Sequence, residues 1–157
     1  MTLKWKSLAA GAAIALVVAF LVIDDPFVAS TNLRPIDPQM LAMGERVYKA
    51  HCASCHGDKL QGQPNWRTRD EQGRLPAPPH DASGHTWHHP DAMLFRLTKF
   101  GLASTAKIPN YKSAMPVYDG VLTDEEIVAV LSWIKAQWPP EVQAQHDKIN
   151  ANAKRSR

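Results

Sequence analysis

The sequence lacks any repeat of fixed period, any low-complexity stretch and any strand-like run of useful length. These absences argue against a repeat protein, a disordered chain and a β-rich domain. Charged residues make up 21% and hydrophobic residues 45% of the chain, which is the composition of a folded protein. The 157 residues suit one small all-α domain.

Clustered charge of one sign is also lacking, although the net charge is +3. Residues 31–138 carry 12 Lys and Arg against 11 Asp and Glu, and the rest of the excess lies in the tail from Pro139. A nucleic-acid-binding face would need its basic residues gathered on the folded body. The mixed signs predict an ordinary solvated surface and no nucleic-acid partner.

A long run without charge occurs at the N-terminus, from Leu8 to Ile23. Its 16 residues fall just below a membrane span of about 17–25 residues and just above a signal-peptide core of about 7–15. We expect residues 1–24 to form a transmembrane anchor or an uncleaved signal segment, followed by a linker over residues 25–37. Lysines before the run and acids after it predict a bacterial inner-membrane protein with its body in the periplasm. Cleavage near Ser30 would instead give a soluble periplasmic protein.

The body, residues 38–140, is expected to be helical. Caps, prolines, glycines and apolar spacing predict three helices: one capped by Asp37 that runs into Cys52, one between Pro90 and Gly101, and one from the Thr123 cap to Pro139. The stretch 57–90 has no long apolar period and predicts mostly loop. Residues 141–157 are polar, and we expect a frayed tail.

The chain has only two cysteines, Cys52 and Cys55, and His56 follows them directly. A disulfide closing so short a loop would remove little entropy from the unfolded chain. A thioredoxin-like redox pair would need a βαβ setting, which a helical chain lacks. A structural zinc site usually takes two such pairs, and there is only one here. These three readings are weaker than the fourth, which is haem attachment.

The pentapeptide Cys52-Ala53-Ser54-Cys55-His56 matches the attachment pattern of c-type haem. Two thiols on one helical turn can each form a thioether with a haem vinyl group. The adjacent His56 imidazole can then bind the iron. The sequence therefore predicts one covalently bound haem c.

A second iron ligand has to come from elsewhere in the chain, and a methionine thioether favours reduced iron. Met115 lies in a predicted loop before the last helix, which is the best placement. Met93 falls on the apolar face of a predicted helix, where core packing is expected. Met40 and Met43 precede the haem motif closely, and their helix would hold them away from the opposite side. We expect His56 and Met115 to be the two iron ligands.

Two segments, GERVYKAHCASCHG and MPVYDGVLTDEEIVAVLSWIKAQWP, resemble the class I cytochromes c. The resemblance covers roughly residues 38–139, all of the folded body, and is to a mono-haem member that has an N-terminal membrane anchor or signal segment. The resemblance implies that the first and last helices cross closely over the haem, with Gly44 and Tyr48 at the crossing. The face that these two residues would meet consists of Val130, Leu131 and Ile134.

The resemblance also implies that a proline carbonyl orients the axial histidine by accepting from its Nδ1–H. Pro78 and Pro79 both qualify, and we favour Pro78. His80 stands where the family usually has an apolar residue. Trp87 could donate its indole N–H to a haem propionate, with core packing as the equal alternative.

Four histidines crowd one short stretch, and their spacing could make a copper or zinc site: His80, His85, His88 and His89. No carboxylate or cysteine obviously converges on them, and we regard a metal site as the minority reading. Trp66 could cover a haem edge. The nearby Arg67, Arg69 and Arg74 could face a propionate or a partner, although such a group is more often a solvated loop.

Three functions follow from these features. The favoured one is an electron carrier, not an enzyme, with redox proteins as donor and acceptor. A peroxidase-like haem enzyme would need Met115 to be absent from the iron. A metal-handling module would use the histidine cluster between His80 and His89.

Overall fold

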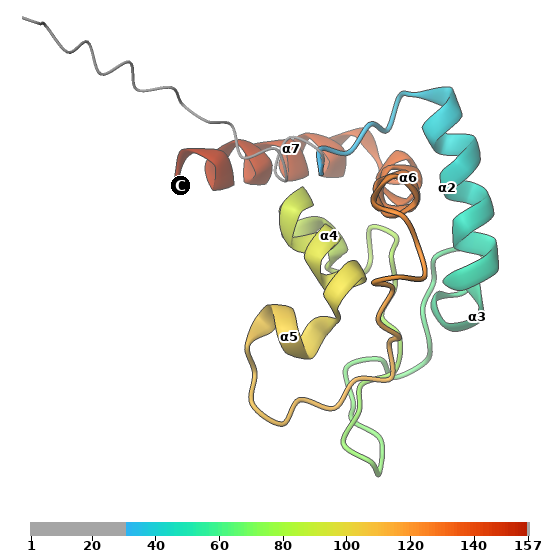
Figure 1. The fold of residues 1–157 in the computed structure, drawn as a ribbon, viewed down its shortest axis with the longest axis vertical. Helices are drawn as coiled ribbons and strands as arrows, with labels where there is room; N and C mark the ends of the chain where they lie inside the picture. Colours follow the sequence, from blue (N-terminus) through green and yellow to red (C-terminus); the bar gives the residue numbers. More distant parts are fainter. Residues whose placement is uncertain (1–30, 157) are drawn as a thin grey trace, which may run out of the picture.

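The computed structural model describes residues 31–156, and within that range every regular element is a helix (Figure 1). The elements in chain order are α2 (Pro38–His51), α3 (Ala53–His56), the 3-10 helix η1 (Thr86–His88), α4 (Asp91–Phe100), α5 (Leu102–Ala106), α6 (Asp124–Ala136) and α7 (Pro140–Arg155). The all-α prediction is confirmed. The stretch 57–90 is loop except for η1, as expected.

The two long helices of the body begin at the caps that the sequence predicts. The Asp37 side chain accepts from the backbone N–H groups of Gln39 and Met40, and Pro38 fills the first helical position of α2. Thr123 and Glu126 form a complete capping box at the start of α6. The α6 helix supplies much of the core, because its residues from Ile127 to Leu131 are almost completely buried.

Helices α2 and α6 pack against each other and cross at Gly44. Figure 1 shows α6 end-on beside α2, which is seen lengthwise. A Cβ atom placed on Gly44 would lie 2.1 Å from the carbonyl oxygen of Ala129 and 2.7 Å from the Cβ atom of Trp133. One turn later, the Tyr48 ring packs on the Trp133 ring with 4.8 Å between centroids. The predicted close crossing is therefore present, and Gly44 permits it.

The C-terminal stretch differs from the expected frayed tail. Pro140 occupies the first turn of α7, so the Pro139–Pro140 pair ends one helix and starts the next. The α7 helix docks through polar groups, since its His146 is fully buried. A helix that docks through polar groups shows no apolar stripe in its sequence, so the sequence does not reveal α7.

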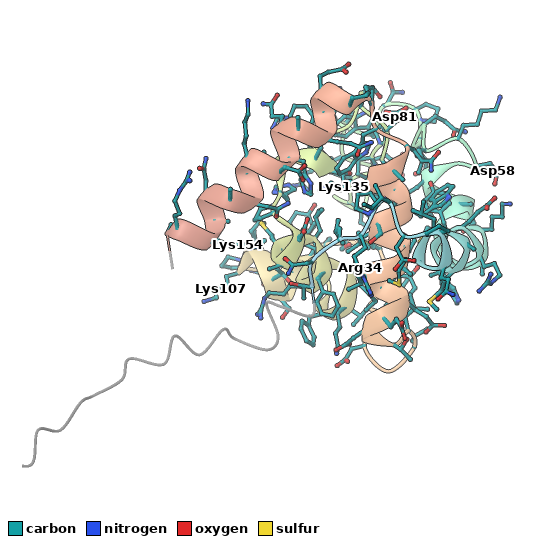
Figure 2. The ribbon with its side chains drawn as sticks, turned by 90° about the horizontal axis from the view of Figure 1, so that it is seen from above. Arg34, Asp58, Asp81, Lys107, Lys135 and Lys154 are labelled. Atoms are coloured by element: carbon teal, nitrogen blue, oxygen red, sulfur yellow. The ribbon has the colours of Figure 1, made fainter. Side chains whose placement is uncertain are left out.

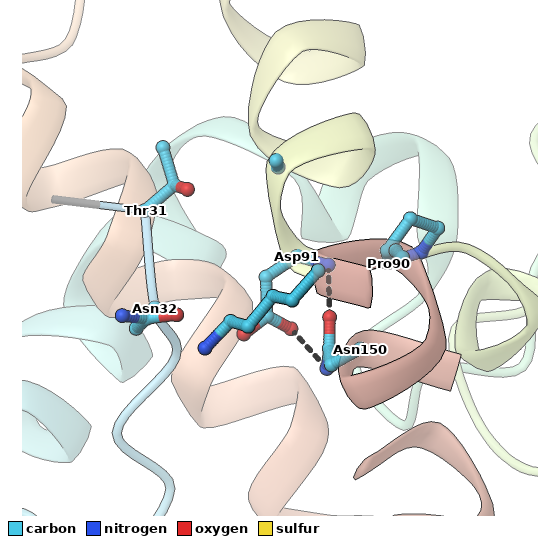
Figure 3. A pocket seen from close by; sticks show the side chains of 8 residues that line it. Thr31, Asn32, Pro90, Asp91 and Asn150 are labelled. Atoms are coloured by element: carbon cyan, nitrogen blue, oxygen red, sulfur yellow. Dashed lines mark hydrogen bonds between the residues drawn. The ribbon is translucent and has the colours of Figure 1, made fainter. Parts of the chain in front are cut away.

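Partly buried hydrogen bonds hold α7 against the start of α4 and against α6. The Asn150 amide donates to Asp91 Oδ1 at 2.9 Å and accepts from the Asp91 backbone N–H at 2.8 Å. Beside this pair is a cavity of about 20 Å³, room for one water molecule, lined in part by Thr31 and Lys154 (Figure 3). Lys135 of α6 reaches Asp147 at 2.5 Å, and Figure 2 shows it between the two helices.

Charged side chains are spread over the molecule (Figure 2). The labelled acids Asp58 and Asp81 lie on the side away from Lys107 and Lys154.

The prediction of an inner-membrane protein is wrong for the part of the chain that the structure describes. From residue 31 to residue 156, no helix combines the length and the apolar character needed to cross a membrane. The longest, α7, has 16 residues and a polar composition, whereas a span takes about 20 apolar residues. The predicted anchor over residues 1–24 lies outside the described residues, as does most of the predicted linker.

Candidate haem site

The two cysteines lie at the junction of α2 and α3. Cys52 ends α2 and precedes the first residue of α3, and its carbonyl accepts from Cys55 N at 3.1 Å and from His56 N at 2.9 Å. These bonds put both cysteines and the histidine on one helical turn. Both thiols are free; Cys55 is exposed and Cys52 is half-buried.

The two thiols have different surroundings. Burial raises the pKa of the Cys52 thiol to about 11, and the neighbouring Cys55 adds to the rise. Cys52 is therefore a protonated thiol at neutral pH. Free, partly accessible thiols at this spacing are the groups that thioether formation with two vinyl groups requires.

His56 is buried, and the geometry fixes one of its two ring nitrogens. Nδ1 lies 2.8 Å from the carbonyl oxygen of Pro78, which can only accept, so the Nδ1–H donates. Burial lowers the pKa of His56, and the hydrogen bond to Pro78 opposes this in part. A neutral imidazole with its Nε2 lone pair free is the form that binds iron.

Pro78 is held in place by a second set of backbone bonds. The segment after His56 pairs with the segment around Pro78 through Gln63 N to Ala77 O at 2.9 Å and through His80 N to Leu60 O at 2.8 Å. Gly62 has φ +68°, and a Cβ atom there would lie 2.4 Å from Pro79 N. A residue with a side chain at this position would therefore push the Pro78 carbonyl away from His56.

Two tyrosines tie the loops to the end of α2. Tyr48 Oη donates to the Gly57 carbonyl at 2.8 Å, directly after the haem motif. Tyr118 Oη donates to the His51 carbonyl at 2.7 Å and anchors the loop that contains Met115. Neither role can be inferred from the sequence, whose only signal is one tyrosine within each of the two segments that resemble the class I cytochromes c.

Met115 lies in the predicted loop and packs against the edge of the core, as does Cys52. Its backbone N–H donates to Ser113 Oγ at 3.1 Å. Met40 is buried within α2, and Met43 also packs against the core. Met115 thus keeps the placement that singled it out, while the methionines of α2 have packing roles.

The four histidines of this stretch do not all converge on one point, and the closest pair is His85 and His89, whose rings meet edge-on with 5.3 Å between centroids. His80 stacks on His56, His85 stacks on Trp66 at 5.8 Å, and His88 stacks on Trp87 at 3.6 Å. Over residues 31–156, no three side chains of the His, Cys, Asp or Glu types gather closely enough to hold a metal ion. The structure gives no support to a copper or zinc site here.

The remaining candidates have protein partners. Trp87 packs against the core and its indole N–H donates to the Ala82 carbonyl at 3.3 Å. The Arg67 guanidinium lies 3.9 Å from the Trp66 ring centre, and Arg74 pairs with Asp70 at 2.9 Å. Arg69 donates to the Gly73 carbonyl at 2.6 Å. These interactions order the loop from within.

The side chains present fit a haem c group. They provide two free thiols at the right spacing, a neutral imidazole with Nε2 available, and a thioether in a tethered loop. The imidazole of His56 and the thioether of Met115 suit the iron of a c-type cytochrome, and the two cysteine thiols suit covalent attachment to the haem vinyl groups. The structure brings Cys52, Cys55, His56 and Pro78 together at one place.

Comparisons with known proteins agree with this chemistry. Residues 39–134 match the family model described as cytochrome c oxidase, cbb3-type, subunit III. A cytochrome c6 from Tetradesmus obliquus is 32% identical over 98 residues, which cover 62% of this chain and 90% of that protein. No solved structure matches the chain. The family match ends within α6, so α7 lies outside it.

Proposed function

We propose that this chain, which belongs to the c-type cytochrome family described as cytochrome c oxidase, cbb3-type, subunit III, carries single electrons between two redox proteins. Its haem would be bound by Cys52, Cys55, His56 and Met115. Members of this family bind covalently attached haem c and pass electrons to redox partners. The chain is accordingly a c-type cytochrome and an electron carrier rather than an enzyme.

The observation that carries the proposal is the geometry at His56. Its Nδ1–H donates to the Pro78 carbonyl at 2.8 Å, and His56 lies on the same helical turn as the two free thiols. The same hydrogen bond raises the basicity of Nε2 and fixes which nitrogen faces the metal. We infer that His56 is the proximal iron ligand.

Cys52 and Cys55 have the attachment role. Each S–H would add across a vinyl double bond of the haem, so that the sulfur would bond to one carbon and the hydrogen would go to the other. Haem c supplies an iron that alternates between Fe(II) and Fe(III). No substrate bond breaks, so these residues have to bind the haem iron in both oxidation states with little change in their own geometry.

Met115 has the distal role in the proposal. A neutral thioether stabilises the reduced state and raises the reduction potential. Tyr118, three residues later, is bonded to the end of α2, which supports the return of this loop toward the haem motif. Two protein ligands would leave no open iron position for peroxide.

The test is the absorption and EPR spectra of the purified holoprotein before and after Met115→Ala. We expect a low-spin wild type with a methionine–iron charge-transfer band, and a variant that has lost both features. Met93→Ala is the matched control, since Met93 lies in α4 and should leave the spectra unchanged. A wild type that is already high-spin and readily binds carbon monoxide would overturn the carrier mechanism in favour of a peroxidase-like enzyme.

A further inference from the structure

His80 lies directly against the histidine proposed to bind iron. The two imidazole rings are stacked, with 3.9 Å between centroids and 25° between planes. Class I cytochromes c, which this chain resembles, usually have an apolar residue at this position. The aromatic contact between His80 and His56 therefore departs from that pattern.

The position of His80 is fixed from several sides. Its backbone N–H donates to the Leu60 carbonyl at 2.8 Å, and its own carbonyl accepts from the Trp138 indole N–H at 2.7 Å. The side-chain Nδ1 lies 2.9 Å from Oγ1 of the buried Thr86. The Tyr48 ring meets it edge-on at 6.5 Å. Backbone and ring are both held, so His80 presents a rigid flat surface.

The His56 ring needs such a surface for its orientation to be defined. The hydrogen bond to Pro78 restrains one ring atom, but hydrogen bonds accept a broad range of angles. The terminal torsion of histidine is itself broad. A parallel ring at contact distance restricts rotation about that torsion, because turning the His56 ring would drive its edge into His80.

We propose that His80 is a positioning residue for His56: its ring sets the plane of the His56 imidazole and, through that plane, the electronic structure and reduction potential of the iron. This proposal rests on the proposed function, since it takes His56 to be the axial ligand. Pro78 sets which nitrogen faces the iron, and His80 sets how the ring is turned. The residue acts through His56 and not on the iron itself.

The experiment compares holoproteins carrying His80→Leu, His80→Phe and the control His88→Leu. Leucine restores the apolar residue usual in the family but offers no flat face, whereas phenylalanine keeps a flat ring without nitrogens. His88 is exposed and stacks on Trp87, so its loss removes a histidine without touching His56. The readouts are the g values of the oxidised haem by EPR and the midpoint potential.

We expect His80→Leu to shift both the g values and the potential, His80→Phe to keep g values near those of the wild type, and His88→Leu to change neither. Unchanged g values and potential in His80→Leu would overturn the proposal. Equal changes in the leucine and phenylalanine variants would also overturn it, because the flat ring would then not be the cause.

His80→Met keeps the test decisive if His80→Leu takes up no haem. Methionine occupies a similar volume with a flexible side chain that offers no flat face to His56. A shift of the g values in His80→Met, relative to the wild type and His80→Phe, supports the proposal, and wild-type values in it contradict the proposal. A wild type without the low-spin histidine–methionine signature would mean that the proposed function had failed. A wild type with that signature, beside a silent His80→Leu, would reject only the role of His80.

Discussion

Gly44 shows at the scale of one residue how the haem motif is positioned. The helix that ends in Cys52 can approach α6 only because Gly44 has no side chain where it meets the Ala129 carbonyl. Gly62 has a similar importance in the loop that places the Pro78 carbonyl beside His56. In both places a backbone approach, rather than a side-chain contact, sets the geometry of the site.

Gly44→Ala should destabilise the protein, because the new methyl group would lie 2.1 Å from the backbone oxygen of Ala129 and force the helices apart. Overpacking of this kind costs about 1–3 kcal/mol, and we expect the upper part of that range to outweigh the gain of about 1 kcal/mol in helix propensity. Denaturant unfolding of the holoprotein measures the change.

Gly120→Ala is a useful comparison, since the added methyl group would meet nothing within 4 Å and only the backbone, at φ +74°, would be strained. The account of the crossing would be contradicted if Gly44→Ala were as stable as the wild type.

The α7 helix shows at the scale of an element how polar groups can dock a helix. His146 is fully buried, with Nε2 at 3.0 Å from the His89 carbonyl and 3.4 Å from Asp91. Burial lowers the pKa of His146 and the Asp91 carboxylate opposes this in part, while Lys135 lowers the pKa further and Asp147 raises it. The folded protein therefore holds this ring in the neutral form.

Stability should fall as the pH drops below 6.5, the ordinary pKa of histidine. In that range the unfolded chain binds a proton on His146 that the folded chain does not, so acid favours unfolding. Above pH 6.5 both states are neutral and the contribution is fully present. The measurement is the free energy of unfolding between pH 8 and about pH 5 for the wild type and His146→Gln.

The pKa values of His80, His85 and His89 are lowered as well, so the difference between the two proteins isolates the contribution of His146. A smaller loss of stability on acidification is expected for His146→Gln. Parallel curves for the two proteins would contradict this role of His146.

At the scale of the whole molecule, the parts predicted from the sequence were those with local signals. Asp37 and Thr123 are caps, and a cap acts on N–H groups within three residues, so the starts of α2 and α6 could be predicted. The haem motif is equally local. The prediction of Pro78 depended on the family resemblance, and the structure places its carbonyl against His56 Nδ1.

The features that could not be predicted depend on contacts between distant residues. Docking of α7 relies on Asn150 meeting Asp91, 59 positions away in sequence. The stacking of His80 on His56 depends on the conformation of the whole loop between them. A polar tail and a histidine-rich loop carry no periodic pattern that would reveal either contact.

The central claim is that the cysteine pair attaches one haem covalently, and mass spectrometry of the denatured protein tests it most directly. We predict that the wild type keeps the mass of one haem per chain after denaturation, with the pyridine haemochrome spectrum of two thioether bonds. Cys52→Ser and Cys55→Ser should each show the spectrum of a single thioether bond. A wild type that releases its haem and returns to the mass of the bare polypeptide would contradict the account.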